Sequence, residues 1–171
     1  LIPHARQFEL YPGAGSDYAF MGAGQMDEAG NVNSTKMGDK SPGAGGFIDI
    51  TANARNVIFC STFTGGGLKV DFSEDGLKIQ QEGKFKKLVK KVQQISYNGA
   101  IALERGQNML YVTERAVFRL TKEGPELIEI AKGVDLERDI LDQMEFVPRI
   151  SEDLKVTSTD FYKDGDRKSV V

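Results

Sequence analysis

The sequence predicts an α/β fold with a mixed sheet. Between residues 68 and 130, short segments of alternating apolar and polar residues follow one another, as expected for half-buried strands joined by turns. Only one stretch, which starts near Val134, has the apolar spacing of an amphipathic helix. Nineteen of the 171 residues are glycine, and their concentration between residues 12 and 67 predicts frequent turns. Many short strands and few helices indicate a sheet as the main layer.

Two apolar strands separated by glycine-rich turns are expected in the first part of the chain. Residues 18–24 predict a buried strand, which leads into a turn at residues 27–31. Residues 47–50 follow a glycine cluster, and their pattern is compatible either with the start of a short helix or with a strand. Residues 57–62 predict the second buried strand, and the three glycines at 65–67 predict the turn after it.

Strands also dominate the middle of the chain, where turn residues separate the apolar segments. They are expected at residues 68–72, 77–79, 93–97, 109–113, 116–120 and 127–130. The turn signal Lys122-Glu123-Gly124-Pro125 lies between the last two segments, so these two should form a hairpin.

The one clear helix is expected after Val134, with Asp135 as its N-cap and Pro148 helping to end the structure after it. Val134 and Ile140 fall near one apolar face, and residues 137–139 point outward. We expect one domain over residues 1–150 and a polar tail over 151–171, with residues 163–168 of that tail frayed or disordered.

Composition excludes several classes of function. The 40% hydrophobic and 27% charged residues are typical of a soluble globular domain, and no apolar run reaches the ~20 residues that span a bilayer. A net charge of -3 gives no electrostatic reason to expect nucleic acid or an anionic membrane as partner. One cysteine, Cys60, lies in an apolar run and is expected to be a buried structural thiol in a reducing, cytoplasmic compartment.

The sequence offers few side chains for a metal site or for a catalytic triad. One histidine, His4, and one cysteine are too few for a zinc site, so no metal is expected. The basic run at residues 84–91 is open to two interpretations. It is either a solvated strand or turn, or a patch that attracts a phosphorylated ligand.

The tightest glycine cluster is the candidate functional loop. Gly43, Ala44, Gly45, Gly46 and Phe47 form a segment whose backbone N–H groups can approach a ligand without side-chain obstruction, and such donors can stabilise a negative oxygen. The alternative is a tight turn between strands. The loop lacks the third glycine of a dinucleotide-binding fingerprint and the Gly-Lys-Ser/Thr of a P-loop.

Five segments in order resemble the second, or beta, half of the family I coenzyme A transferases that act on short-chain acyl and 3-ketoacyl substrates. The segments are Met21–Asn33, Gly43–Ile50, Val57–Gly66, Tyr111–Leu120 and Leu127–Leu136. The resemblance is to the fused, single-chain type, such as propionate or acetate CoA-transferases and acetyl-CoA:acetoacetyl-CoA transferase. It implies an open mixed sheet flanked by helices and incomplete at its N-terminal side, with residues 1–150 as the C-terminal part of the beta domain.

The resemblance also implies a reaction and a site. A family glutamate would attack acyl-CoA and pass through an acyl anhydride and a glutamyl-CoA thioester, with CoA as substrate and no cofactor. The N–H groups of Gly46 and Gly45 would form the oxyanion hole, and Gly43, Ala44 and Phe47 would contact substrate or CoA. The Glu-Asn-Gly or Glu-Ser-Gly motif that carries the nucleophile is absent from this sequence, so we expect this segment alone to be inactive.

The expected partners are acyl-CoA, a carboxylic acid, and the missing N-terminal part of the enzyme or an alpha subunit. An incomplete sheet would also favour a homo-oligomer. Two other functions stay open. One is a non-catalytic CoA-binding or regulatory module that kept the fold, and the other is a related CoA-ester hydrolase.

Overall fold

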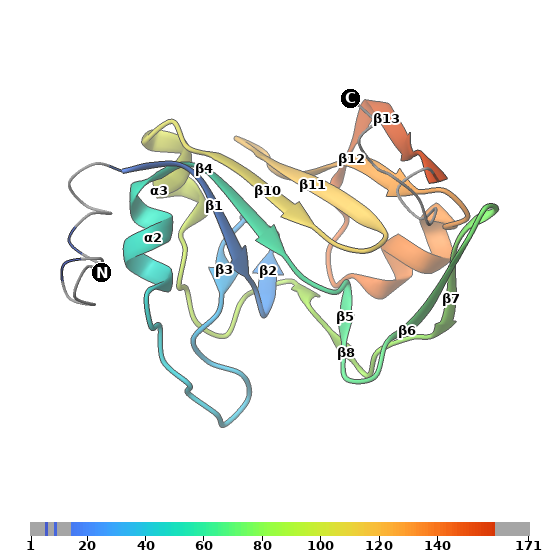
Figure 1. Ribbon diagram of the computed structural model, residues 1–171, viewed down its shortest axis with the longest axis horizontal. Coiled ribbons are helices and arrows are strands. Elements are labelled where there is room, and N and C mark those ends of the chain that lie inside the picture. The colour runs from blue at the N-terminus through green and yellow to red at the C-terminus, as the bar shows by residue number, and fades with distance from the viewer. Residues whose placement is uncertain (1–5, 7–8, 10–14, 160–171) are drawn as a thin grey trace.

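A six-stranded open sheet forms the centre of the protein in the computed structural model, which describes residues 6, 9 and 15–159 (Figure 1). In order across the sheet, its strands are β1 (Ser16–Gly22), β4 (Ala54–Cys60), β10 (Asn108–Val112), β11 (Ala116–Thr121), β12 (Gly124–Ala131) and β13 (Arg149–Thr157). Strands β1, β4 and β10 are parallel, β11 and β12 form an antiparallel hairpin, and β13 runs parallel to β12. The predicted open, mixed α/β sheet is therefore confirmed.

Two short helices, α2 (Phe47–Asn53) and α3 (Gly99–Glu104), pack near the parallel end of the sheet (Figure 1). Phe47 stacks on Phe59 of β4 with ring centroids 5.7 Å apart, and Ala102 of α3 is buried in the same cluster. Successive side chains of a strand point to opposite faces, so Phe59 and its neighbours of the same parity form the covered face of the sheet. The segment 47–50, open between helix and strand on sequence, thus begins a helix.

The other face of the parallel strands is open to solvent. Tyr18 and Phe20 on β1 are 64% and 69% exposed, and Ile58 of β4 lies beside Phe20 in register. Cys60 has the same parity as Ile58, so it is exposed rather than buried. The prediction of a buried thiol was wrong because an apolar run does not reveal which face of the sheet each residue occupies.

Three small sheets complete the fold. Their strands are β3 (Val32–Asn33), β2 (Gln25–Asp27) and β9 (Leu88–Val89) in one, β5 (Thr64–Gly65) and β8 (Phe85–Lys86) in the second, and β6 (Lys69–Ser73) and β7 (Gly76–Gln81) in the third. Met26, Val32 and Leu88 are fully buried and join the main core. The β6–β7 hairpin lies at the end of the molecule opposite α2 (Figure 1), and its Leu77 N–H donates to the Lys132 carbonyl at 2.7 Å.

Several sequence expectations need correction. Residues 93–97 form no strand and only a single bridge, from Tyr97 to Val32. The late helix consists of a π-helical turn, η1 (Leu136–Ile140), and a 3₁₀ turn, η2 (Leu141–Gln143), in place of a regular α-helix. Its N-cap is confirmed, since Asp135 accepts a hydrogen bond from the Arg138 N–H at 2.8 Å.

The polar segment after residue 150 continues the sheet. β13 runs through the boundary between residues 150 and 151 and pairs with β12, because an edge strand can carry polar side chains on its solvent side. His4 and residues 163–168 lie outside the described residues. Within the described chain, no helix is long and apolar enough to cross a membrane.

Candidate functional site

The carboxyl ends of the parallel strands bring three parts of the chain to one edge of the sheet. β1, β4 and β10 end in register at Gly22, Cys60 and Val112. Helix α2 precedes β4 and packs against β1 and β4, and in a connection between parallel strands the helix returns antiparallel to them. The glycine loop before α2 therefore lies toward this edge, where open α/β sheets commonly bind ligands.

The glycine loop holds two residues in left-handed backbone conformation. Gly43 has φ of 88° and Gly45 has φ of 51°, and a Cβ atom on either would meet no atom within 4 Å. A turn closes the loop, with the Phe47 N–H donating to the Ala44 carbonyl at 3.0 Å. Within the described part of the chain, the N–H groups of Gly45 and Gly46 donate to no acceptor. The loop therefore presents two N–H donors without an acceptor among the described residues, and the space beside Gly45 is open.

The helix behind the loop is firmly anchored. The Phe47 side chain is only 5% exposed and stacks on Phe59. The Gln107 side-chain amide donates to the Thr51 and Ala54 carbonyls, at 2.9 and 2.6 Å, and so ties the end of α2 to the segment before β10. These contacts fix the direction in which the loop donors point.

A cavity of about 690 Å³, called here the strand-end cavity, opens beside the same strand ends. Its lining includes Lys40, Lys86, Lys87, Met37 and Phe85, and among its described lining residues none is acidic. The segment holding Met37 and Lys40 runs directly into the glycine loop. The cavity is therefore positively charged, with an apolar portion of its wall.

Lys87, which lines this cavity, meets two further polar side chains, Ser61 and Tyr111. The Lys87 ammonium donates a short hydrogen bond to the Ser61 hydroxyl, which in turn donates to the Ala23 carbonyl at 2.8 Å. The Tyr111 hydroxyl lies beside Ser61, is fully buried, and has no hydrogen bond of normal geometry within the described chain. Burial raises the pKa of Tyr111 to about 12. Burial also lowers the pKa of Lys87, and the charge of Glu114 opposes that shift.

A buried arginine holds the surrounding loops together. Arg115 has a fully buried side chain and pairs with Glu82 and with Glu114, the latter at 2.7 Å. Its guanidinium lies 4.9 Å from the centre of the Phe63 ring. Glu114 also accepts from the Phe63 N–H at 2.9 Å. Arg115 thus joins the β10–β11 turn to the segments that follow β4 and β7.

The relatives of this chain share one chemistry by name. No protein-family profile matches the sequence. The chain is 46% identical over 165 residues to the acetate CoA-transferase YdiF of Escherichia coli K12, a match that covers 96% of this chain and 31% of the relative. It is 48% identical over 159 residues to the caffeate CoA-transferase of Acetobacterium woodii, covering 90% of this chain and 30% of the relative. This chain belongs to the family I coenzyme A transferases.

Solved transferase structures agree with that membership. The fold matches the apoenzyme of the acyl-CoA transferase YdiF from Escherichia coli O157:H7 with a TM-score of 0.93 at 44% identity, over 96% of this chain and 32% of that chain. The same protein is known as a thioester complex with CoA. The chain spans about a third of the length of the relatives it matches (31% and 30%). The family resemblance read from the sequence is confirmed, and the roles of individual residues stay predictions.

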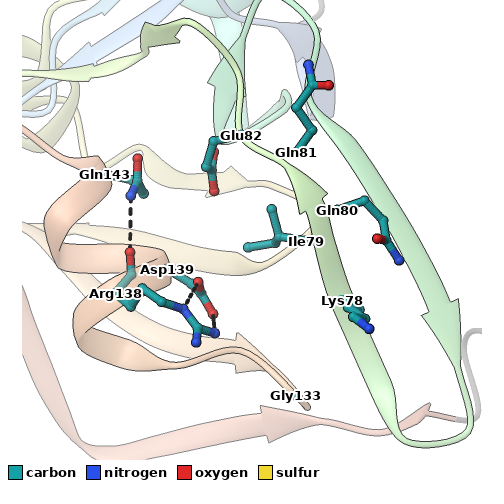
Figure 2. Close-up of a pocket in the computed structure, with 9 residues that line it drawn as sticks. All are labelled: Lys78, Ile79, Gln80, Gln81, Glu82, Gly133, Arg138, Asp139 and Gln143. Carbon is teal, nitrogen blue, oxygen red and sulfur yellow. Dashed lines mark hydrogen bonds and ion pairs between the residues drawn. The ribbon is translucent and has the colours of Figure 1, made fainter.

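A second cavity in this chain, of about 380 Å³, lies between β7 and the η1 turn (Figure 2). Three of its four charged lining residues, Glu82, Arg138 and Asp139, have a charged partner among the described residues. Arg138 forms two hydrogen bonds with Asp139, at 2.7 and 2.8 Å, and Glu82 pairs with Arg115. Figure 2 shows the Arg138–Asp139 pair on η1, facing the β7 side of the cavity. The arrangement is that of a structural contact between the hairpin and the turn.

Sequence reasoning missed most of the strand-end cluster. Lys87 lies within the basic run 84–91, which was expected to be solvated or to attract phosphate, and the run does form the short strands β8 and β9. Ser61 and Tyr111 carry no local signal, because they meet only through strand register. For α3 a signal existed, since Asn98 caps this helix by accepting from the Ile101 N–H at 3.0 Å.

Proposed function

We propose that this chain is the C-terminal part of the beta half of an acyl-CoA:carboxylate CoA-transferase, which moves CoA between short-chain acyl or 3-ketoacyl thioesters and carboxylic acids. The observation that carries the proposal is the anchored glycine loop with two free N–H donors, in a chain 46% identical to an acetate CoA-transferase. The same loop in an unrelated chain would support only a tight turn.

The chemistry needs a glutamate from outside this chain. Its carboxylate would attack the thioester carbonyl, and the C–S bond would break. CoA thiolate would depart, and the product on the enzyme would be an acyl-glutamyl anhydride. The thiolate would then attack the glutamyl carbonyl, release the first carboxylate and form a glutamyl-CoA thioester. The thioester complex known for the relative supports this intermediate. The incoming acid would take CoA by the same two steps in reverse.

The glycine loop would act on the charge that develops in each addition step. Every tetrahedral intermediate places a negative charge on the former carbonyl oxygen, and fixed N–H donors stabilise it without reorganisation. We assign that role to Gly46, with Gly45 beside it. Gly43 and Ala44 would let the thioester approach. A role for Phe47 in substrate binding stays a prediction, since its buried ring holds the loop in place.

The complete protein would act in the cytoplasm, with its N-terminal part or an alpha subunit completing the cleft, and as a homo-oligomer. CoA and its thioesters are substrates in this scheme, so no metal or cofactor is required.

The test compares two substitutions at Gly46 in the complete protein. Gly46→Pro removes the N–H, and the φ of -85° at this residue is close to what proline requires. Gly46→Ala keeps the N–H. We expect proline to lower kcat for acyl exchange by about 10²–10³-fold and alanine to have a much smaller effect. Equal loss in both variants at unchanged melting temperature would contradict the oxyanion role.

Trapping separates the transferase from the two other functions. Borohydride reduction or hydroxylamine treatment after incubation with acyl-CoA should modify one glutamate of the complete protein. CoA binding by calorimetry without exchange or trapping would support a binding module. Release of free acid and CoA with water as sole acceptor would support a CoA-ester hydrolase.

A further inference from the structure

The Lys87 ammonium is a half-buried cation without a carboxylate partner in the described structure. Among residues 15–159 no carboxylate oxygen lies within 4.0 Å of it, and its hydrogen bond goes to the neutral Ser61 hydroxyl. Glu114, the acid whose charge it senses, has its oxygens engaged by the Phe63 N–H and by Arg115. A partly buried charge is costly unless an opposite charge compensates it.

Lys87 is also the lysine best placed to bind a ligand in the strand-end cavity. The Lys86 ammonium, which lines the same cavity, is occupied by the carbonyls of Asp142 and Met144 at 2.7 and 3.1 Å. Lys40 is exposed at the cavity edge. Ser61 accepts from Lys87 while donating to the Ala23 carbonyl, so it fixes the ammonium without neutralising it.

We infer that Lys87 binds an anionic oxygen group of a substrate in the strand-end cavity, with Met37 and Phe85 against the apolar part of the same ligand. The group is a carboxylate of the acid or a phosphate of CoA. The inference rests on the proposed function for the identity of these two sources. The side chains of Met37 and Phe85 can contact such a ligand, since they are 37% and 67% exposed.

Ser61 and Tyr111 are positioning residues in this assignment. The fully buried Tyr111 hydroxyl lies beside Ser61 without a hydrogen bond of normal geometry in the described chain, so a small movement of Ser61 on ligand binding would give it a partner. Because Ser61 follows β4 and Tyr111 belongs to β10, the parallel strand ends hold the ammonium in a fixed place.

The experiment uses the complete protein with Lys87→Met, Lys87→Arg and Ser61→Ala, and Lys122→Met as the matched control. Lys122 is an exposed lysine in the β11–β12 turn and does not line the cavity. KM is measured separately for the carboxylic acid and for acyl-CoA. We expect Lys87→Met to raise one of the two by about tenfold or more, since hydrogen bonds between charged groups are strong. Lys87→Arg should recover part of the loss, and Ser61→Ala should shift the same KM by less.

The two sources give different outcomes. A higher KM for the acid alone identifies the carboxylate, and a higher KM for acyl-CoA alone identifies the phosphate. Unchanged KM values for both in a Lys87→Met protein that melts like Lys122→Met would overturn the inference.

A binding measurement keeps the inference separate from the proposed function. Calorimetric titration of CoA and of acetate into the same variants reports anion binding without turnover. Binding that Lys87→Met weakens, in a protein without acyl exchange, would refute the transferase proposal and support the anion site. Intact acyl exchange, together with CoA and acetate binding that Lys87→Met leaves unchanged, would support the transferase proposal and refute the anion site.

Discussion

Arg115 shows how much one residue can hold together in this chain. Its side chain is fully buried, and it contacts Glu82, Glu114, the Asp139 carbonyl at 3.0 Å and the Phe63 ring. Buried charges of this kind contribute through the cost of leaving a partner unpaired more than through net attraction. Since Glu114 lies near Lys87, the network also supports the electrostatics of the strand-end cavity.

Replacing Arg115 should therefore be strongly destabilising. Arg115→Met leaves the partly buried carboxylates of Glu82 and Glu114 without their cation, and we expect the free energy of unfolding to fall by about 3–5 kcal/mol. The matched control is Arg55→Met, because Arg55 pairs with Asp17 at 3.6 Å on an exposed surface. That pair should be worth less than about 1 kcal/mol. Urea unfolding compares the two, and equal losses would refute the role of burial.

At the scale of elements, the η1 turn depends on two aspartates with different tasks. Asp135 caps the turn, and Asp139 accepts from the Arg138 side chain and from the Asp135 N–H at 2.9 Å. Asp139 was expected to point outward, yet it is 7% exposed. The regular helix period failed here because the π-helical turn rotates the side chains that follow it.

Acid should weaken this element through Asp139. In the folded protein the pKa of Asp139 lies below the ordinary aspartate value of 3.8, mainly because Asp139 accepts hydrogen bonds from Arg138. Its stabilising contribution is therefore complete above that ordinary value and is lost as pH falls through the lower, folded pKa. Asp139→Asn should cost about 1–2 kcal/mol at pH 7 and progressively less in acid.

The measurement is urea unfolding of wild type and Asp139→Asn between pH 7 and pH 3. Asp142→Asn, which changes an exposed carboxylate in the next turn, serves as the control and should behave like wild type. A difference between Asp139→Asn and wild type that stays constant with pH would contradict this account.

For the molecule as a whole, the open face of the parallel strands is the most consequential surface. Parallel sheets are usually covered on both faces, whereas α2 and α3 pack on one face here. Among the described strands, β1 pairs only with β4 and leaves its other edge unpaired. The exposed Tyr18 and Phe20 lie on that edge strand, and such a surface favours association.

Self-association of the 171-residue chain should depend on this surface. The average mass of the wild-type chain, measured by light scattering, should increase with protein concentration. Replacing Tyr18 and Phe20 together by serine should make that increase smaller. Val147→Ser is the control, because Val147 is 82% exposed but lies outside this face. A wild-type chain that is a monodisperse monomer at all concentrations would contradict the prediction of an oligomer.

The sequence by itself determined the α/β class, the hairpin at Lys122–Pro125, the Asp135 cap and the family, because each depends on local spacing or on residues met in order along the chain. Tertiary structure decided which faces are buried and which distant side chains meet. Cys60 became exposed through strand parity, and β13 joined the sheet despite its polar composition. Lys87, Ser61 and Tyr111 come from separate segments, so only the parallel register of β4 and β10 and the packing of the loops around it could bring them together.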